Sequence, residues 1–579
     1  MKNSSFNMYA IALVFYAVIF ALGSYPSIET HPGYYGMTYG IIHPESFSSD
    51  VVGNHTPAAF SLQTLLVQWG GELWLDERFV MCVWFLIVGL SLWGVDRLMT
   101  LMGVTSGWDK LVVLAIIMGY HKFVDNIPRV IDSACVRPTT LSGPIVIWLS
   151  VWLLQGRQWL TIWFLAFLSV AVSVKNSWIW WVMTSIHFCH DHLGWPVRRL
   201  WFFGASVFLL VLTLYGCWQM AQGGLSVNAR LFDDLIAHTE NSEANPLMDG
   251  LGPWAFLGFL LVSLRCQPPA PWPRRRWGFL VGVFAAIYVL GGLYYTFAPD
   301  ILKMPLLAGF AVNRSTWWVQ ILIFMVLSAW ALLRWNGPKT AVDWPAFLAL
   351  TALFYFPLID HVYWKQWLQG SFWKLDPLMA KKFILTTGAM VFCSGFYVLI
   401  RGRLPGVNWR HALLAPLIIS MFFSAGKKLV EQKEALSFLM HYGILGNTPG
   451  AQWVGVNEYI RRSTPADSQI LALTGNPLHL DSSLKIRTGR TMPHNYSSLA
   501  LYFDLEKTIW ARKYEERVAQ LPQYWQFCDS AGMRMILGEM KWPQYIVLPR
   551  NHFCQADRVG YALDQTINGF NIWRRNKDR

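Results

Sequence analysis

Charged residues are scarce in this chain of 579 residues: Asp, Glu, Lys and Arg together make up 14%, whereas 54% of the residues are hydrophobic. Soluble globular domains carry about 25% charged residues. The shortage of charge therefore excludes a soluble globule of this length. It predicts a mainly α polytopic membrane protein.

Motifs that mark common soluble enzymes are missing as well. The sequence has no CxxC, no HExxH, no Walker glycine loop and no GxGxxG that follows a strand and opens a helix. Only eight cysteines are present, and six lie in or beside apolar runs, where cysteine behaves as a small hydrophobic residue. Cys528 and Cys554 are the exceptions, and either a disulfide or two buried thiols fits them.

Long apolar runs are abundant. A membrane-crossing helix needs about 20 mostly apolar residues, and shorter runs are tolerated beside longer neighbours. About thirteen such spans are predicted by this rule. The third and sixth are short, and either one is also compatible with a re-entrant segment. The predicted spans lie near residues 8–24, 77–95, 109–121, 141–155, 158–174, 177–190, 200–219, 251–266, 277–297, 317–334, 343–359, 382–400 and 411–425.

The distribution of Lys and Arg predicts the orientation of these spans, because basic residues in short loops resist translocation. With the N-terminus inside, the inner loops hold 15 Lys and Arg, including "PRRR" at 273–276 and "RGR" at 401–403. The outer side before residue 426 holds 12, spread over roughly twice the loop length. An odd number of spans then places the remaining chain outside.

Residues 426–579 differ in character from the apolar region 1–425. They contain 20 Lys and Arg against 14 Asp and Glu. The stretch "VNEYIRRSTPADSQ" is typical of a helix that stops at Ser-Thr-Pro, and "ILALTG", "YIVLPR" and "FNIWRR" are typical of short strands. We expect a separate extracytoplasmic α/β domain of common size.

Two acidic residues stand out in the first outer loop, which is about 50 residues long and so exceeds a simple connection. Asp50 and Glu45 lie in "HPESFSSD" at residues 43–50, between His43 and His55. Asp50 also fits a helix cap or a turn in "SSDVVGN", and Glu45 also fits a solvated turn. The following stretch "TPAAFSLQTLLVQWGGELW" is amphipathic and suits the membrane interface.

Cations gather in the second outer loop, "HKFVDNIPRVIDSACVRPTT", at residues 121–140. Lys122, Arg129 and Arg137 lie there, and Arg314 lies on the same predicted face. The planar fork of arginine suits the capture of phosphate oxygens. Internal ion pairs with Asp125 and Asp132 explain the same residues equally well.

Two other polar groups receive plainer interpretations. His190 and His192 in "HFCHDH" have the spacing of metal ligands, but they lie near the inner end of the short sixth span, and we interpret them as loop residues. We interpret Asp233 and Asp234 as residues of a solvated helix face. The sequence therefore assigns no metal ligand.

The layout resembles the GT-C superfamily of integral membrane glycosyltransferases, and more narrowly its bacterial members. The resemblance rests on the span number, the acidic first loop, the arginine-bearing second loop that runs into "RPTTLSGPIVIWLSVWLLQGRQWL", and the outer domain with "VNEYIRRSTPADSQILAL". It implies an isoprenoid-phosphate sugar donor and a carboxylate in the first loop, for which Asp50 matches best and Glu45 second. Lys122, Arg129, Arg137 and Arg314 would contact the lipid phosphate.

Departures from the family narrow these expectations. The first loop has no DxD or ED pair, the nearest being Asp76 and Glu77, so a divalent metal cofactor stays open. The signature "WWDYG" is absent, which argues against protein N-glycosylation. The expected partners are the isoprenoid-phosphate-linked sugar and membrane lipids, with no nucleic acid. The expected location is the bacterial cytoplasmic membrane, with the N-terminus cytoplasmic and the C-terminal domain periplasmic or extracellular.

Two other classes of function remain open. A transporter or flippase for a lipid-linked or anionic substrate also needs many spans and outer cations, although paired broken helices are not evident. A non-catalytic assembly protein would retain the scaffold alone, because a fold does not imply an activity.

Overall fold

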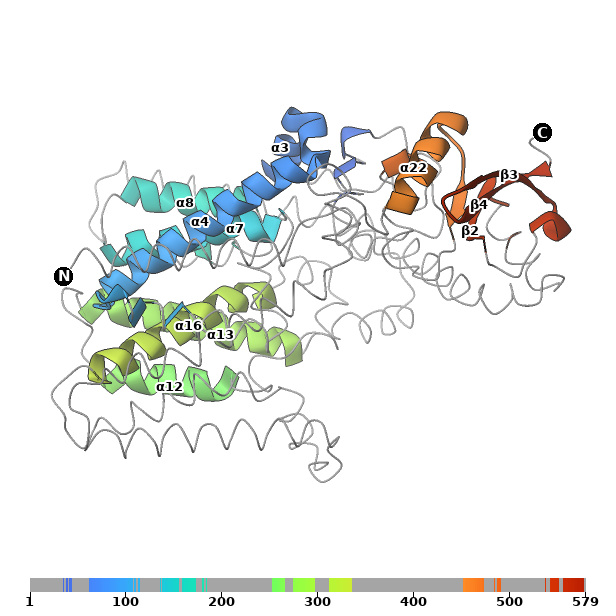
Figure 1. Cartoon of the computed structure of the whole chain (residues 1–579). Coiled ribbons are helices and arrows are strands. Elements are labelled where there is room, and N and C mark those ends of the chain that lie inside the picture. Colours follow the sequence, from blue (N-terminus) through green and yellow to red (C-terminus); the bar gives the residue numbers. More distant parts are fainter. Residues whose placement is uncertain are drawn as a thin grey trace, which may run out of the picture.

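The computed structural model describes the chain in separate stretches, coloured in Figure 1. The described residues are 35, 38–39, 41–43, 62–107, 109–110, 113–114, 136, 138–155, 159–172, 177, 180–181, 184, 252–265, 274–296, 312–335, 451–472, 484, 487–490, 537, 542–550 and 556–576.

The described residues before 336 are helical apart from short connections. Pro138 at the first position of α7 is favourable, because its missing N–H would have no partner inside the helix. The elements are α3 (Leu62–Gly70), the 3-10 helix η1 (Gly71–Leu75), α4 (Glu77–Leu101), α7 (Pro138–Gln155), α8 (Trp159–Val172), α12 (Gly252–Arg265), α13 (Arg274–Thr296) and α16 (Val312–Trp335).

Six of these helices fall on predicted spans. The helices α4, α7, α8, α12, α13 and α16 coincide, to within a few residues at the ends, with the runs predicted at 77–95, 141–155, 158–174, 251–266, 277–297 and 317–334. Helices α4, α7 and α13 extend beyond the predicted run at one end and α16 at both ends, because backbone hydrogen bonding continues through polar residues where hydropathy ends, whereas α8 and α12 lie within their predicted runs. The other predicted spans lie outside the described residues or are described only at single positions.

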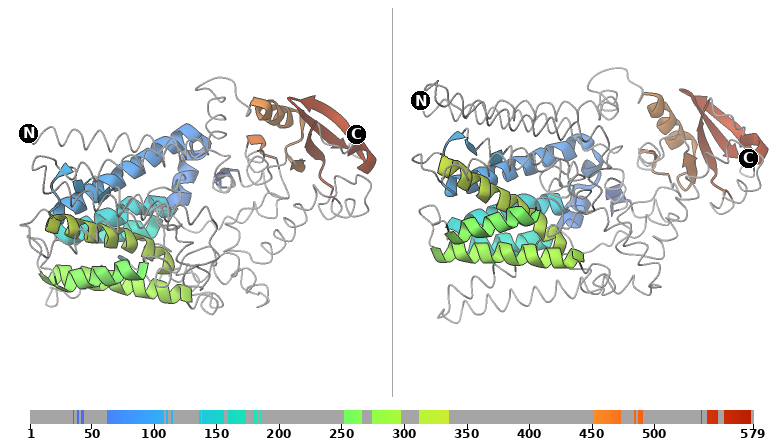
Figure 2. Two further views of the ribbon diagram at one scale, coloured as in Figure 1. Left: turned by 60° about the horizontal axis from the view of Figure 1, so that its bottom comes forward. Right: turned by 90° about the horizontal axis from the view of Figure 1, so that it is seen from below.

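The helices pack as two groups around one apolar core. Helix α7 contacts α4 and α8, and α16 contacts α12 and α13; Figures 1 and 2 show the two groups side by side. Gly94 allows close packing of α4 on α7, because a Cβ there would lie 2.5 Å from Cγ2 of Ile147. Buried residues of both groups, Trp84 and Ile323 among them, belong to a single cluster.

One helix in the described part of the chain, α4, is long and apolar enough to cross a membrane by length and composition. Shorter apolar stretches lie at Thr140–Gln155, Thr161–Val172, Val281–Leu293 and Val319–Trp330. A buried helix of a soluble protein passes the same test, so the thirteen spans remain a prediction. Large apolar side chains are nevertheless exposed along the helices, such as Leu86 and Trp93 on α4, Phe164 on α8 and Leu261 on α12.

The described C-terminal residues form a small sheet with one helix. The elements are α22 (Ala451–Ser463), β1 (Ile470–Ala472), β2 (Tyr545–Pro549), the 3-10 helix η6 (Ala556–Val559), β3 (Tyr561–Ile567) and β4 (Phe570–Arg575). The strand order is β1-β2-β4-β3, with β1 parallel to β2 and the other pairs antiparallel. Figure 1 places this sheet and α22 beyond the α3 end of the helices.

Local sequence explains this sheet. The predicted helix ends at Ser463, before Pro465, and β1, β2 and β4 form in the three predicted runs. Asn568 and Gly569 have φ of +48° and +89° and close the β3–β4 hairpin, the geometry that Asn-Gly favours. Val456 and Ile460 of α22 pack on the sheet.

Candidate functional site

A sharp corner joins α3 to α4. Gly71 has a φ of +50°, a conformation that glycine adopts without steric cost. Trp74 fixes the corner, since its Nε1 donates a hydrogen bond to the carbonyl oxygen of Leu66 at 2.8 Å. Asp76 then caps α4 by accepting a hydrogen bond of 2.9 Å from the backbone N–H of Arg78. The corner brings the end of the first loop to the N-terminal end of α4.

A histidine and a carboxylate pair at this corner. Nε2 of His43 lies 2.5 Å from Oε1 of Glu72, where an imidazole N–H donates to the carboxylate. The side chain of His43 is 29% exposed and that of Glu72 is 69% exposed, so solvent reaches the pair. The ring of Tyr39 contacts the imidazole at 4.6 Å between centroids.

An ion pair joins the start of α4 to the C-terminal part of the chain. Nη2 of Arg487 lies 3.0 Å from Oε1 of Glu77, and the two side chains are only 15% and 10% exposed. Glu77 is the first residue of α4, where a negative charge also interacts favourably with the helix dipole. We name Tyr39, His43, Glu72, Glu77 and Arg487 the α4 head cluster.

Arg490 anchors the segment that carries Arg487. Its Nε donates to Oγ1 of Thr464 at 3.0 Å, and its Nη2 donates to the carbonyl oxygens of Arg461 and Thr464 at 2.9 and 2.7 Å. These bonds cap the last carbonyls of α22, a common role for a basic side chain at a helix C-terminus. Burial lowers the pKa of Arg490.

The α4 head cluster gathers groups that handle protons and anions. The pair of His43 and Glu72 has the arrangement of a base oriented by a carboxylate, and it is accessible to a polar molecule. Glu77 and Arg487 are mostly buried and bind each other, so they serve first to hold two parts of the chain together.

Most of the site residues predicted from the sequence lie outside the described residues: Glu45, Asp50, Lys122, Arg129 and Arg137. Arg314 lies in the first turn of α16, and its side chain is not described. Cys528 and Cys554 also lie outside the described residues. The roles that the resemblance implies for these carboxylates and cations therefore stay predictions.

Only part of the α4 head cluster could be anticipated from the sequence. The sequence shows Glu77 as an acidic residue at the edge of a predicted span, and it shows His43 as one of the histidines of the first loop. Arg487 carried no signal, because its partner lies 410 residues away in the chain. A buried ionisable residue in the first turn of an apolar helix is the feature that invites a search for such a partner.

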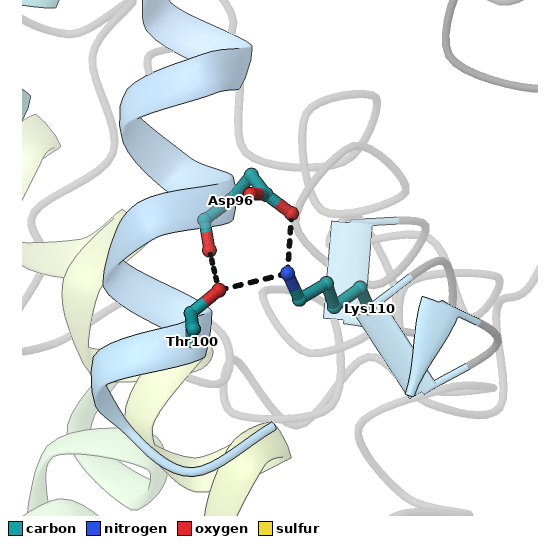
Figure 3. A network of polar contacts seen from close by, with 3 residues as sticks. All are labelled: Asp96, Thr100 and Lys110. Carbon is teal, nitrogen blue, oxygen red and sulfur yellow. Dashed lines mark hydrogen bonds and ion pairs between the residues drawn. The ribbon is translucent and has the colours of Figure 1, made fainter. Parts of the chain in front are cut away.

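The opposite end of α4 carries a different polar contact, drawn in Figure 3. Nζ of Lys110 donates to Oδ1 of Asp96 at 2.6 Å and to Oγ1 of Thr100 at 2.8 Å. The hydroxyl of Thr100 in turn donates to the backbone carbonyl of Asp96. The side chains of Lys110 and Asp96 are 12% and 23% exposed. The carboxylate of Asp96 neutralises the charge of Lys110, and we interpret this network as a structural contact.

Within the described stretches, no group of three or more His, Cys, Asp or Glu side chains gathers in a way that would hold a metal ion. The acidic residues of the first loop at 45 and 50 and the histidines at 190 and 192 lie outside these stretches. A divalent metal cofactor therefore stays open, as in the sequence analysis.

Comparison with known proteins identifies no family for this chain. No protein-family model matches the sequence, and no curated protein matches it either. Proposals about function therefore rest on composition, layout and the α4 head cluster.

Proposed function

We propose that this chain is an integral membrane glycosyltransferase that moves a sugar from an isoprenoid-phosphate donor to an acceptor outside the cytoplasm. The acceptor is a glycan, a lipid or a protein. The proposal includes about thirteen spans, a cytoplasmic N-terminus and an extracytoplasmic C-terminal domain.

Several observations support a membrane enzyme. The chain has few charges, and helices occupy six of the predicted apolar runs. Large apolar side chains such as Leu86 and Leu261 are exposed on these helices, as expected for surfaces that face lipid. An isoprenoid tail requires such an apolar environment.

The observation that carries the proposal is the α4 head cluster. In a chain with 14% charged residues, His43, Glu72 and Glu77 gather where the long first loop meets α4, and Arg487 joins them from the C-terminal part. Ionisable groups beside apolar spans are costly and mark functional regions. The loop that ends here also holds Asp50 and Glu45.

Each proposed residue has a physical role. Asp50 accepts the proton of the acceptor hydroxyl as its oxygen attacks the anomeric carbon, and Glu45 is the second candidate for this base. The anomeric carbon loses its bond to the phosphate oxygen in the same step. The cations stabilise the negative charge that develops on the departing lipid phosphate. These cations are Lys122, Arg129, Arg137 and Arg314.

The test compares Asp50→Asn with the unchanged chain in purified membranes supplied with a radiolabelled polyprenyl-phosphate sugar. Loss of a general base lowers the transfer rate by roughly 100- to 10,000-fold. Binding of the donor and insertion of the protein should persist, because Asn keeps the size of the side chain. Asp233→Asn is the matched control, since Asp233 is interpreted as part of a solvated helix face.

The outcomes separate the classes of function. Transfer that depends on Asp50 but not on Asp233 supports the enzyme. Full transfer by Asp50→Asn removes Asp50 from the chemistry and leaves Glu45 to be tested. If the unchanged chain moves the labelled lipid across the bilayer without transferring sugar, the protein is a flippase. If it neither transfers sugar nor moves the lipid, the assembly protein is favoured.

A further inference from the structure

The segment around Arg487 touches three separate parts of the molecule. Leu484 is fully buried in the core between α22 and the sheet. Arg490 is bonded to the C-terminal end of α22. Arg487 is bonded to Glu77 at the start of α4. Such a segment connects the C-terminal domain to the helices through side chains.

A close backbone approach lies beside the ion pair. Gly489 has a φ of +66°, and a Cβ added there would lie 2.6 Å from Oη of Tyr39. Tyr39 in turn contacts the ring of His43, which is bonded to Glu72. The first loop, the start of α4 and the C-terminal part therefore meet within one continuous set of contacts.

We propose that Leu484 and residues 487–490, which we name the clasp, are an interdomain docking element. Its partner surface in the same chain is formed by Glu77 and Tyr39. The clasp holds the C-terminal domain against the first loop, and the ion pair and the Tyr39–Gly489 contact act together. This proposal does not depend on the sugar-transfer chemistry.

The burial of the ion pair explains why it specifies one docked arrangement. A carboxylate and a guanidinium that are 10% and 15% exposed lose most of their hydration, and their mutual contact offsets part of this loss. Any arrangement that separates Glu77 from Arg487 removes this contact while both charges remain buried, unless water enters. Docking is therefore expected to be all or none.

A double-mutant cycle on the purified full chain in detergent micelles tests this. The variants are Glu77→Gln, Arg487→Met and the double variant, and the measured quantity is the rate at which proteinase K cleaves the C-terminal domain from the helices. Each single variant leaves one charge behind and should raise the rate by roughly tenfold or more. The double variant removes both charges, so its rate should lie far below the product of the two single effects.

Arg462→Met is the matched control, because Arg462 belongs to the same domain and its side chain is exposed on α22. Its cleavage rate should stay within about twofold of the unchanged chain. Rates that multiply in the double variant would show that Glu77 and Arg487 do not interact, and would overturn the proposal.

A second test uses backbone geometry and no charge. Gly489→Ala introduces a methyl group against Tyr39, whereas Gly560→Ala meets no atom within 4 Å although Gly560 also has a positive φ of +93°. Gly489→Ala should therefore speed cleavage more than Gly560→Ala does. Tyr39→Phe removes Oη and should abolish this excess, because the next ring atom is 3.5 Å away. Equal effects of the two glycine substitutions would contradict the docked arrangement.

Discussion

The contact between α4 and α7 leads to a sharp prediction about Gly94. This residue is buried on α4, and a Cβ placed on it would lie 2.5 Å from Cγ2 of Ile147 and 3.3 Å from Nε1 of Trp148. Ile147 is 2% exposed, so it has little room to move. Gly94→Ala therefore forces α4 and α7 apart or displaces Ile147. Small residues serve the same purpose where helices cross closely in membranes.

The expected magnitude follows from a comparison within one helix. Gly89, also on α4, has no atom within 4 Å of its added Cβ, so Gly89→Ala adds only the better helix propensity of alanine, about 0.5–1 kcal/mol. Gly94→Ala gains the same term and loses about 1–3 kcal/mol to overpacking. The propensity term cancels between the two variants, which leaves a difference of about 1–3 kcal/mol in the free energy of unfolding.

Unfolding of the two variants in mixed detergent micelles, followed by the helical circular dichroism signal, measures this difference. Ile147→Leu supplies the rescue, because leucine has no Cγ2 and nearly conserves the volume of isoleucine. In that background Gly94→Ala should cost much less. Equal stability of Gly89→Ala and Gly94→Ala would show that α4 and α7 do not meet at Gly94.

Two further predictions concern single polar contacts. Burial, followed by the hydrogen bond of 2.8 Å to Asp564, raises the pKa of Tyr459 to about 12. The phenol therefore stabilises the fold fully below its unfolded pKa of about 10, and this contribution is lost as the pH rises through about 12. The difference in the free energy of unfolding between the unchanged chain and Tyr459→Phe should shrink between these two pH values. Lys110→Gln should lower the free energy of unfolding by about 1.5–3 kcal/mol, because it removes a charge-assisted hydrogen bond to Asp96. A loss under about 0.5 kcal/mol would contradict this, because it is the value expected for an ion pair that is exposed to solvent.

Elements with a strong local pattern were predictable from the sequence. The strands β1, β2 and β4 are short apolar runs, and α22 ends just before Pro465. The strand β3 was missed because "YALDQTI" alternates between covered and exposed positions at the sheet edge and has no continuous apolar run. The Asn568-Gly569 turn after it was the signal that would have revealed the hairpin.

The candidate site was less predictable because its contacts are not local. The sequence singled out Asp50 and Glu45 within the first loop, and these stay predictions. The contacts that the structure supplies at the end of this loop involve His43, Glu72 and Glu77. No periodicity links Glu77 to Arg487, since their approach results from the packing of the whole chain between them.

That long-range contact restricts how the chain can thread a membrane. A direct ion pair requires the start of α4 and Arg487 to lie on the same side of any bilayer that α4 crosses, so the chain must cross an even number of times between residues 77 and 487. Twelve of the predicted spans lie in this interval, which satisfies the condition. If one of the short spans at 109–121 and 177–190 is re-entrant, the other must be re-entrant too. Cysteines introduced at the exposed positions Glu72 and Arg462 should therefore react with a membrane-impermeant reagent from the same side of the membrane, and labelling from opposite sides would be incompatible with the pairing of Glu77 and Arg487.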